Sequence, residues 1–464
     1  MNILEMLKSS DKAALIQGEK CVTYYELLNS GMQFGKKLKD CGIKSGSHVL
    51  VFVPLSIELY IAMIGAWTIG AIPIFIDFSQ GAKFVNNSIE RLTPDIIICD
   101  KVTSLVRLTY AKMRKLRKLK IIIDFTDSIR QSAKLQCDHP AIMTLTSGTT
   151  GIPKIAVRTH GFLIAQYHAL TAHMDYNENH VDLGTLPVFT LASLASHMTI
   201  LLPNKSYKSK INFADLALQM QEECVSRAIC SPAIMSKLLN HSDFPDLRSV
   251  YLGGAPVYPS VLKKIPKRVD LNIVYGSTEA EPIAGIAWAD VSENDRQNIS
   301  NGAGLLVGHI VPEVECRIGN NSEIQVSGET VLKGYLGGIG DEENKILEGD
   351  KTWHKTGDAG YIDEQGRLWL LGRVSQAIHD ESGTLYPFCA ECILDSHFGI
   401  RGAFLLQNKE RVAVIEKGFV NENDVLQALK SQHISKIITI KKIPMDKRHG
   451  AKIDYERLLK SLLR

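Results

Sequence analysis

"VLVFVPLSIELYIAMIGAWTIGAIPIFIDF", residues 49–78, is the longest apolar stretch of the chain, and it decides the fold class. Its length would be enough for a membrane span. Pro54, Glu58 and Pro73, however, divide it into a β-rich run, a helix-length run and a second β-rich run. Two parallel strands are joined through a crossover helix in this way. We therefore expect a buried strand–helix–strand unit here, and no transmembrane segment.

Short runs rich in Val and Ile alternate with helical patterns along most of the chain, which predicts a parallel sheet covered by helices. After Val307 the pattern changes to short alternating strands, and residues 360–373, "GYIDEQGRLWLLGR", predict a hairpin. From about Val374 the pattern is compact α+β, and it ends in an amphipathic helix from about Tyr455. The strand-like runs are Val49–Val53, Ile72–Ile76, Ile96–Cys99, Ile121–Asp124, Ile142–Thr146, Ser249–Leu252 and Asn272–Tyr275.

The expected fold class is α/β, in two domains. Residues 1–373 are predicted to form a large N-terminal domain of parallel-sheet αβα layers, with a small β-rich subdomain at about residues 307–373. Residues 374–464 are predicted to form a small, mobile α+β domain that acts as a lid.

The composition restricts the classes of partner. The chain has 464 residues, of which 45% are hydrophobic and 22% charged, as is usual for a globular protein. A net charge of +3 gives no reason to expect a nucleic acid partner. The N-terminus lacks the apolar region of a signal peptide and the nine cysteines are scattered, so we expect a cytoplasmic protein. For the single C-x-x-C, Cys389 and Cys392, incidental thiols are favoured over zinc or redox chemistry.

"KMRKLRKLK", residues 112–120, is the strongest run of charge. Its apolar residues recur at every third position, so we expect a helix with a solvated basic face. The alternative is a surface that docks an acidic carrier protein or an anionic headgroup.

"TLTSGTTGIPKIAVRTH", residues 144–160, gathers hydroxyl groups, glycines and one lysine, Lys154. It follows a strand-like run and precedes a helix-length run from Gly161. Hydroxyls and backbone amides at a strand-to-helix turn suit oxyanions. The lysine spacing does not fit the P-loop pattern G-x-x-x-x-G-K-[ST], and taken alone the stretch could be an ordinary Gly/Thr turn.

Two further stretches, "YLGGAP" (251–256) and "VYGSTEAEP" (274–282), each follow a β-rich run, where parallel α/β sheets place their ligands. Tyr275 could stack on a base, and Glu279 could hold Mg²⁺ beside phosphate. A capping box at a helix start would explain the Ser-Thr pair equally well.

In "HKTGDAGYIDEQGRLWLLGR" (354–373), Asp358 lies in a tight glycine-flanked turn and can accept two hydrogen bonds from a ribose diol. An Asx turn would also explain this carboxylate. "IPMDKRHGAKIDYERL" (443–458) is a cationic loop before the last helix.

At these spacings the four stretches together resemble the adenylate-forming superfamily of acyl- and aryl-CoA synthetases, non-ribosomal adenylation domains and luciferases, over essentially the whole chain. The resemblance implies a ligase that uses ATP and Mg²⁺. It implies that the β- and γ-phosphates are cradled by Thr146, Ser147, Gly148, Thr149, Thr150, Gly151 and Lys154. It implies an adenine and α-phosphate site at Gly253, Gly254, Ala255, Tyr275, Gly276, Ser277 and Thr278, with Glu279 on Mg²⁺. It also implies that Asp358 holds the ribose, that Arg373 contacts ribose or phosphate, and that Lys452 is the catalytic lysine.

The acyl pocket of this superfamily lies after the phosphate loop, here "LPVFTLASLASHMTILLP", residues 186–203, with Phe189, Thr190 and His197 as candidates. The stretch holds no acid and, apart from His197, no base. An amino-acid substrate would need a buried carboxylate for its ammonium, because an unpaired buried charge is costly. We therefore expect an apolar acyl chain.

Several details resemble the β-lactone synthetases of olefin biosynthesis, among them "LPVFTLASLASHMT" and "PMDKRHGAKID". In that branch the 3-hydroxyl of the acyl adenylate closes a β-lactone and releases AMP. The alternatives are thioester formation with CoA or an acyl carrier protein, and a catalytically silent relative. Ser375 and Gln376 stand where CoA ligases carry an acid at the hinge, and Lys447 is a lesser candidate for the catalytic lysine.

Overall fold

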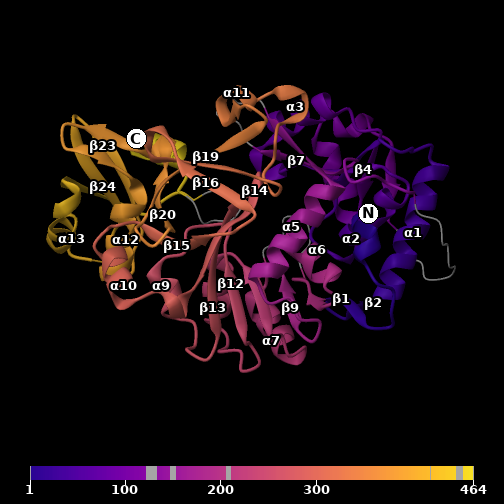
Figure 1. The fold of residues 1–464 in the computed structure, drawn as a ribbon, viewed down its shortest axis with the longest axis horizontal. Coiled ribbons are helices and arrows are strands. Elements are labelled where there is room, and N and C mark those ends of the chain that lie inside the picture. The colour runs from indigo at the N-terminus through magenta and orange to yellow at the C-terminus, as the bar shows by residue number, and fades with distance from the viewer. Residues whose placement is uncertain are drawn as a thin grey trace. The chain divides into compact units, whose positions relative to one another are not determined.

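The computed structural model describes residues 2–121, 133–146, 153–204, 211–418, 420–445 and 453–462. The chain divides into two compact units, and Figure 1 labels many of their helices and strands. The residues on both sides of position 373 belong to the second unit, so the predicted domain boundary there stays a prediction. The first unit comprises Met1–Ile229, Phe244–Leu247 and Leu332–Lys345, and the second comprises Cys230–Asp243, Arg248–Val331 and Ile346–Arg464.

A six-stranded sheet in the first unit has the order β6-β5-β3-β4-β7-β8. Its strands run parallel except for β8, which pairs antiparallel with β7. Helix α2, Ile57–Thr68, connects β3 to β4, which confirms the buried strand–helix–strand unit predicted at residues 49–78. The strands are β3 (His48–Phe52), β4 (Ile72–Phe75), β5 (Ile96–Cys99), β6 (Lys118–Lys120), β7 (Pro140–Thr146) and β8 (Lys154–Thr159).

Five more strands of the first unit pair in the order β11-β9-β10-β1-β2, parallel except for the β1–β2 hairpin. They are β1 (Ala13–Gln17), β2 (Lys20–Thr23), β9 (Val181–Gly184), β10 (Thr199–Leu201) and β11 (Arg227–Cys230). Among the described residues of both units, no helix has the length and apolarity that crossing a bilayer requires. The α-helices of this unit besides α2 are α1 (Tyr24–Asp40), α3 (Ala82–Leu92), α4 (Lys101–Val106), α5 (His160–His173), α6 (Pro187–Ala195), α7 (Phe213–Glu222) and α11 (Asp341–Asn344).

Helices α1 and α2 pack with their backbones unusually close. A Cβ on Gly35 of α1 would lie 2.1 Å from Thr68 Oγ1 and 2.8 Å from the carbonyl oxygen of Gly65, both on α2. A Cβ on Gly31 would lie 2.3 Å from a side-chain carbon of Ile64. The two helices can approach in this way only because glycine has no side chain.

The second unit contains a mixed sheet with the strand order β16-β17-β19-β20-β15-β14-β13-β12, in which β18 pairs with β19. Strands β12 and β13 are parallel, whereas β13–β14, β14–β15, β15–β20, β16–β17, β17–β19 and β19–β20 pair antiparallel. The strands are β12 (Ser249–Leu252), β13 (Asp270–Ser277), β14 (Ala280–Ala287), β15 (Leu305–Ile310), β16 (Val314–Ile318), β17 (Glu323–Gly328), β18 (Lys345–Glu348), β19 (Lys351–Ile362) and β20 (Arg367–Arg373).

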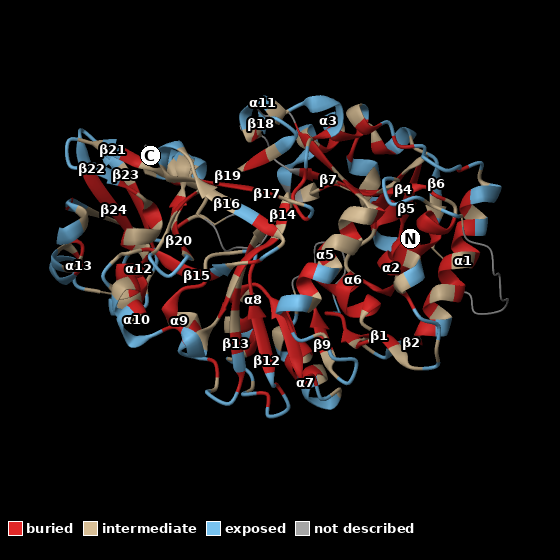
Figure 2. Cartoon of the chain, viewed as in Figure 1, coloured by how far each residue is buried: buried red, intermediate tan, exposed pale blue. Residues whose placement is uncertain are grey.

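After Arg373 the chain of the second unit forms a 3₁₀ turn at residues 374–376, a β21–β22 hairpin and a three-stranded sheet β23-β24-β25. Buried strands and helix faces, red in Figure 2, provide the core of each unit. The remaining strands are β21 (Ile378–Asp380), β22 (Gly383–Leu385), β23 (Gly402–Gln407), β24 (Glu410–Glu416) and β25 (Ile434–Ile440). The α-helices of this unit are α8 (Pro232–Leu238), α9 (Pro259–Leu262), α10 (Glu293–Ser300), α12 (Pro387–Phe398), α13 (Glu422–Ala428) and α14 (Tyr455–Leu462).

Six of the seven predicted strand runs are strands, as are both arms of the hairpin predicted at residues 360–373, and the last helix begins at Tyr455 as predicted. The α/β fold class is confirmed. The seventh run, Ile121–Asp124, lies almost wholly outside the described residues.

Two predictions are wrong. Residues 112–120 do not form an α-helix: Met113–Lys115 make a 3₁₀ turn and Lys118–Lys120 make strand β6. A repeat of three fits the 3₁₀ turn better than the 3.6-residue α-helix, and lysines are common on such short strands at a sheet edge. The expected strand-to-helix turn is the second: the helix predicted from Gly161 is present as α5, but strand β8 lies between Thr146 and this helix.

The close approach of α1 and α2 can be tested by adding volume. We expect Gly35→Val to lower the free energy of unfolding by about 1–3 kcal/mol, because the new methyl groups would overlap Thr68 and the backbone of Gly65. Lys36→Val is the matched control, since Lys36 is exposed on the same helix and the change costs about 0.5 kcal/mol of helix propensity. Urea unfolding followed by circular dichroism measures both variants. Equal midpoints for the two variants would contradict the tight packing.

Candidate active site

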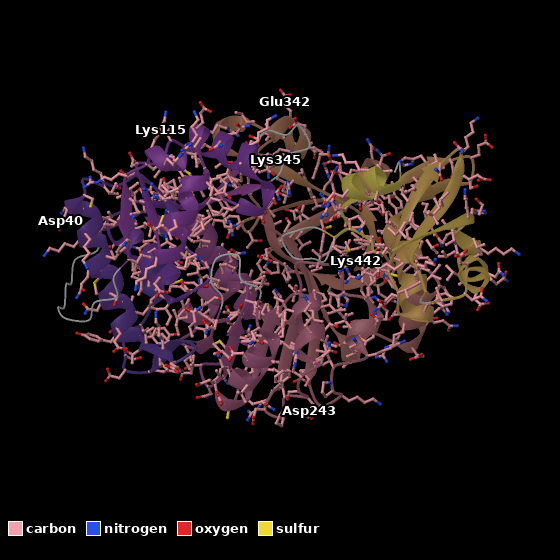
Figure 3. All side chains as sticks on the ribbon, turned by 180° about the vertical axis from the view of Figure 1, so that it is seen from behind. Asp40, Lys115, Asp243, Glu342, Lys345 and Lys442 are labelled. Atoms are coloured by element: carbon pink, nitrogen blue, oxygen red, sulfur yellow. The ribbon has the colours of Figure 1, made fainter. Side chains whose placement is uncertain are left out.

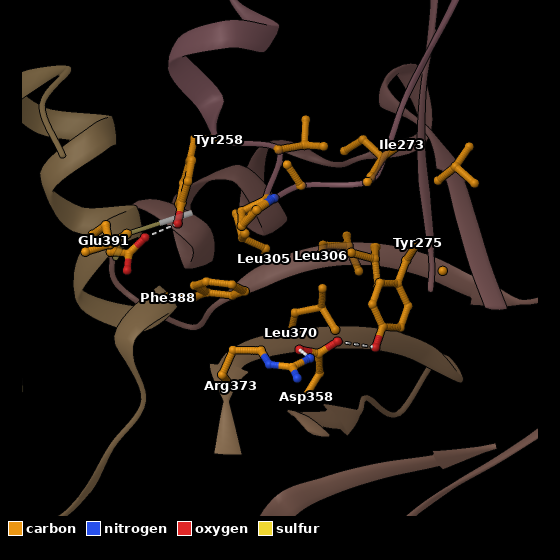
Figure 4. A pocket seen from close by; sticks show the side chains of 18 of the residues that line it. Tyr258, Ile273, Tyr275, Leu305, Leu306, Asp358, Leu370, Arg373, Phe388 and Glu391 are labelled. Atoms are coloured by element: carbon orange, nitrogen blue, oxygen red, sulfur yellow. Dashed lines mark hydrogen bonds and ion pairs between the residues drawn. The ribbon is translucent and has the colours of Figure 1, made fainter. Parts of the chain in front are cut away.

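A cavity of about 120 Å³ lies in the second unit, where the loop after β12 meets strands β13, β15, β19 and β20 and helix α12 (Figure 4). Its walls combine apolar side chains such as Leu305 and Leu370 with a few polar groups. A concave apolar surface with a small number of fixed polar groups is the usual form of a small-molecule site.

The carboxylate of Asp358 is the best-held polar group of this cavity. Tyr275 Oη donates a hydrogen bond to Asp358 Oδ2 at 2.9 Å, and Arg373 Nη1 donates to Asp358 Oδ1 at 2.8 Å (Figure 4). Asp358 and Arg373 are directly opposite in the β19–β20 pairing, so the sheet register brings them together. Arg373 Nη1 also donates to the carbonyl of Thr356 at 3.2 Å. The three predicted residues Tyr275, Asp358 and Arg373 therefore form one cluster.

Burial and the charge of Asp358 shift the pKa values of the other two residues of this cluster. Burial, followed by the charge of Asp358, raises the pKa of Tyr275 well above its usual value, so the phenol keeps its proton and donates it. Burial works against the charge of Arg373, but Asp358 more than offsets this effect and the pKa of Arg373 is raised. Gly357, with φ of +71°, leaves room for the guanidinium, because a Cβ there would lie 2.9 Å from Arg373 Nη2.

The loop after β12 supplies another wall of the cavity. A Cβ on Gly253 would lie 2.8 Å from the carbonyl oxygen of Val274, so this loop lies against β13 at a distance that only glycine allows. Gly254 has φ of +73°, a conformation that suits glycine. Gly254 and Ala255 line the cavity together with Tyr275 and Gly276, so the structure brings these four candidate residues together.

Thr278 and Glu279 form the turn of the β13–β14 hairpin, so the alternative of a helix start at this place is wrong. The turn follows Ser277, whose hydroxyl oxygen is buried and has no hydrogen-bond partner among the described residues. Glu279 lies close enough to raise the pKa of Arg373 further. In the described part of the chain, no three His, Cys, Asp or Glu residues gather into a metal site.

Several predicted residues fall outside this description. Residues 147–151, Lys447 and Lys452 are outside the described residues, and of Thr146 only the backbone, at the end of β7, is described. Lys154 belongs to the first unit and begins β8 opposite Thr146. Its side chain is buried, with Nζ 5.5 Å from the centre of the Tyr335 ring.

The predicted acyl-pocket residues belong to the first unit and are not among the residues that line the cavity. Phe189 and Thr190 are buried on α6, where Thr190 Oγ1 donates to the carbonyl of Leu186 at 3.1 Å. The ring of His197 lies 4.3 Å from that of Tyr24, and its Nε2 is 3.1 Å from Ser10 Oγ. Burial, then the charge of Lys12, lowers the pKa of His197, so its ring is neutral at pH 7.

Sequence reasoning missed the far end of the cavity, where helix α12 meets the start of α9. Tyr258 Oη donates a hydrogen bond to Glu391 (Figure 4), and the backbone N–H of Ser260 donates to Asp395 Oδ2 at 2.8 Å. Burial raises the pKa of Glu391 to about 7, and it also raises the pKa of Asp395. The available signal was two acids four residues apart, on one face of an otherwise apolar helix.

The fold and this cavity define an α/β enzyme with a ligand site beside the ends of parallel strands. Residues 5–336 match the AMP-binding enzyme family, so the chain belongs to that family. It is accordingly an ATP-dependent, adenylate-forming ligase, as the resemblance predicted.

Known relatives agree with this assignment over nearly the whole chain. An olefin β-lactone synthetase from Xanthomonas campestris is 27% identical, covering 90% of this chain and 86% of its own. A 2-succinylbenzoate–CoA ligase from Bacillus licheniformis is 25% identical, covering 83% and 82%. The structure of an o-succinylbenzoate–CoA synthetase from Bacillus subtilis, in complex with its acyl-adenylate intermediate, has the same fold, with a TM-score of 0.80 and 19% identity over 97% of this chain and 95% of that one.

The raised pKa of Glu391 predicts a pH-dependent stability. The folded chain keeps a proton on this carboxyl up to about pH 7, whereas the unfolded chain loses it near the ordinary glutamate pKa of 4.5. Stability is therefore lost as the pH rises from about 4.5 to about 7, by roughly 2–3 kcal/mol at about 1.4 kcal/mol per pKa unit.

Glu391→Gln removes this titration, and we expect its urea midpoint to fall less over the same pH range. Glu381→Gln, at an exposed position, should keep the pH dependence of the parent chain. A pH profile of Glu391→Gln that is parallel to that of the parent would contradict the buried, protonated carboxyl.

Proposed function

We propose that this ligase converts an apolar carboxylic acid, of the fatty or 3-hydroxy fatty acid class, into its acyl adenylate, and then closes a β-lactone with release of AMP. The observation that carries the adenylation step is the cavity in which a tyrosine ring, a carboxylate and a guanidinium converge. The family match supports the same step.

The cavity has the chemistry that the adenosine part of ATP requires. Each carboxylate oxygen of Asp358 accepts one side-chain hydrogen bond, from Tyr275 or from Arg373, and a carboxylate oxygen can accept two, so capacity is left for the ribose hydroxyls. The Tyr275 ring offers a flat surface to adenine, and Gly254 and Ala255 line the same cavity. Ser277, with its buried hydroxyl, and the turn Thr278–Glu279 follow Tyr275 along the chain. We assign Ser277 and Thr278 to the α-phosphate and Glu279 to Mg²⁺.

Charge neutralisation is the main demand of the reaction. The substrate carboxylate forms a bond to the anionic α-phosphorus while the bond to the departing pyrophosphate breaks. Cations must offset the charge on both partners and on the leaving group. We assign this task to Lys452, to Lys154, and to the hydroxyl-rich loop at residues 146–151. Mg²⁺, held by Glu279 and the phosphates, would add Lewis-acid stabilisation.

In the second step the 3-hydroxyl oxygen bonds to the acyl carbonyl carbon, the bond from that carbon to the AMP oxygen breaks, and the hydroxyl gives up its proton. The nucleophile is already part of the substrate, so its effective concentration is high and no second substrate is needed. The β-lactone synthetase among the relatives supports this product.

The apolar substrate class rests on helix α6 and its neighbours. Residues 189–195 of this helix are buried and carry no charged side chain, and residues 186–203 contain no acid. Nothing in this segment could pair with the ammonium of an amino acid, and an unpaired charge would be costly there.

Thioester formation with CoA, or with a carrier protein, is the second candidate for the last step. The CoA ligases among the relatives favour it. Gln376, at the turn after Arg373, lines the cavity in the place where CoA ligases usually carry an acidic hinge. This departure is our reason for preferring the lactone.

The decisive experiment measures pyrophosphate release with fatty acids and 3-hydroxy fatty acids, each with and without CoA, and identifies the product by mass spectrometry. We expect release without CoA and a β-lactone from the 3-hydroxy acids alone. Release that requires CoA, with an acyl-CoA as product, would overturn the lactone step in favour of the second candidate. No release with any acid would overturn the substrate class.

A variant tests the site itself. Asp358→Asn keeps the shape but removes the charge that holds Arg373 and the proposed ribose hydroxyls. We expect kcat/KM for ATP to fall about 10- to 100-fold, because hydrogen bonds to charged groups contribute about 1.5–3 kcal/mol. Asp350→Asn, in an exposed turn of the same unit, should leave it unchanged. Equal kinetics for the two variants would exclude Asp358 from ATP binding.

A further inference from the structure

The described chain has one strongly basic surface that the proposed reaction does not use. It is formed by α4, the 3₁₀ turns at Arg107–Thr109 and Met113–Lys115, and strand β6, and we call it the 101–120 surface. No Asp or Glu occurs between positions 101 and 123. The basic residues are Lys101, Arg107, Lys112, Arg114, Lys115, Arg117, Lys118 and Lys120.

Hydrogen bonds hold the two halves of this surface side by side. Arg107 Nη1 donates to the carbonyls of Met113 and Leu116, at 3.1 and 3.4 Å. Lys118 Nζ donates to Ser104 Oγ of α4 at 2.7 Å. The basic run therefore flanks α4 in space as well as in sequence.

Apolar side chains project from the same surface. Val102, Leu105 and Leu108 are 45, 71 and 49% exposed, whereas Met113 is fully buried. Their spacing of three residues puts them on one stripe of α4 and the turn that follows it. Single exposed apolar side chains are ordinary. Three of them within seven residues, beside eight cations, are not what a solvated charged face would show.

Most of the outermost cations here have no anion to pair with. Lys112 pairs with Glu90 at 3.0 Å. Within the described ranges, no hydrogen bond or ion pair is made by the side chains of Lys101, Arg114, Lys115 (labelled in Figure 3) or Lys120. Their charge is thus available to an external anionic partner.

We propose that the 101–120 surface binds an anionic lipid bilayer, with its cations at the headgroup phosphates and Val102, Leu105 and Leu108 inserted at the boundary of the acyl region. Charge complementarity argues for an anionic partner. The protruding leucines argue for a bilayer over an acidic protein, because basic residues beside a stripe of inserted apolar side chains are the features of interfacial binding. The proposal rests on this surface alone and does not depend on the function proposed above.

The test is co-sedimentation of the full chain with vesicles. We expect binding to vesicles of phosphatidylglycerol mixed with phosphatidylcholine, little binding to pure phosphatidylcholine, and a marked loss in high KCl, because salt screens exposed charges. Each cation near such a surface strengthens binding about fivefold. Arg114→Glu, Lys115→Glu and Lys120→Glu combined should therefore weaken binding at least about tenfold.

Matched controls separate this surface from general effects. Lys409→Glu, Lys430→Glu and Lys436→Glu make the same change of net charge at exposed positions of the second unit, and should bind like the parent. Leu105→Ser with Leu108→Ser should weaken binding, whereas Leu218→Ser with Leu347→Ser, at equally exposed positions, should not.

Three results would overturn the proposal. They are equal binding of the parent chain to both kinds of vesicle, binding that KCl does not reduce, and equal loss in the surface and control variants. The first two need no variant, so they apply even if a variant fails to fold. Binding of a purified acidic acyl carrier protein at this surface, without vesicle binding, would assign the surface to a protein partner instead.

Discussion

The carboxylate of Asp358 connects three separate parts of the second unit. Its donors come from β13 and β20, and it lies itself on β19, so one charged group fixes the mutual position of three strands. A half-buried carboxylate is stable only while its partners stay in place, since an unpaired buried charge is costly. Gly357 and Gly253 contribute to the same arrangement. Because glycine has no side chain, the Arg373 guanidinium can approach Gly357 and the Val274 carbonyl can approach Gly253. The ring, the carboxylate and the guanidinium are therefore organised before any ligand arrives, which reduces the ordering cost of binding.

Strand pairing explains why residues far apart in the chain meet there. Strands β12 and β13 run parallel and end on the same side, which puts the Gly253–Ala255 loop beside Tyr275. The β19–β20 hairpin then returns Arg373 to Asp358 through antiparallel register. Parallel and antiparallel pairing thus supply different walls of one cavity.

Much of this arrangement could be predicted from the sequence, for physical reasons that differ between elements. The run Ile96–Cys99 is short, β-branched and wholly buried, so composition alone indicates a strand. The Asp-Glu-Gln-Gly turn at residues 363–366 likewise indicates the β19–β20 hairpin from local composition alone. Strand β8 was missed because its six residues run directly into α5, with Thr159 as the N-cap, and no turn signal separates them. The contact of Glu391 with Tyr258 was missed because it depends on how α12 packs on α9, and an acid on a helix is usually solvated.

The buried carboxyls of helix α12 would link any motion of residues 374–464 to a change of protonation. Its two carboxyls, Glu391 and Asp395, are held against Tyr258 and Ser260 at the start of α9. A rotation about the turn at residues 374–376 could move α12 away from α9. Glu391 would then pass from a site where its pKa is about 7 to water, where its pKa is near 4.5. Each opening near neutral pH would then release a fraction of a proton, and each closure would take it up again. Such a motion would couple the position of this helix to the proton concentration of the solution by mass action.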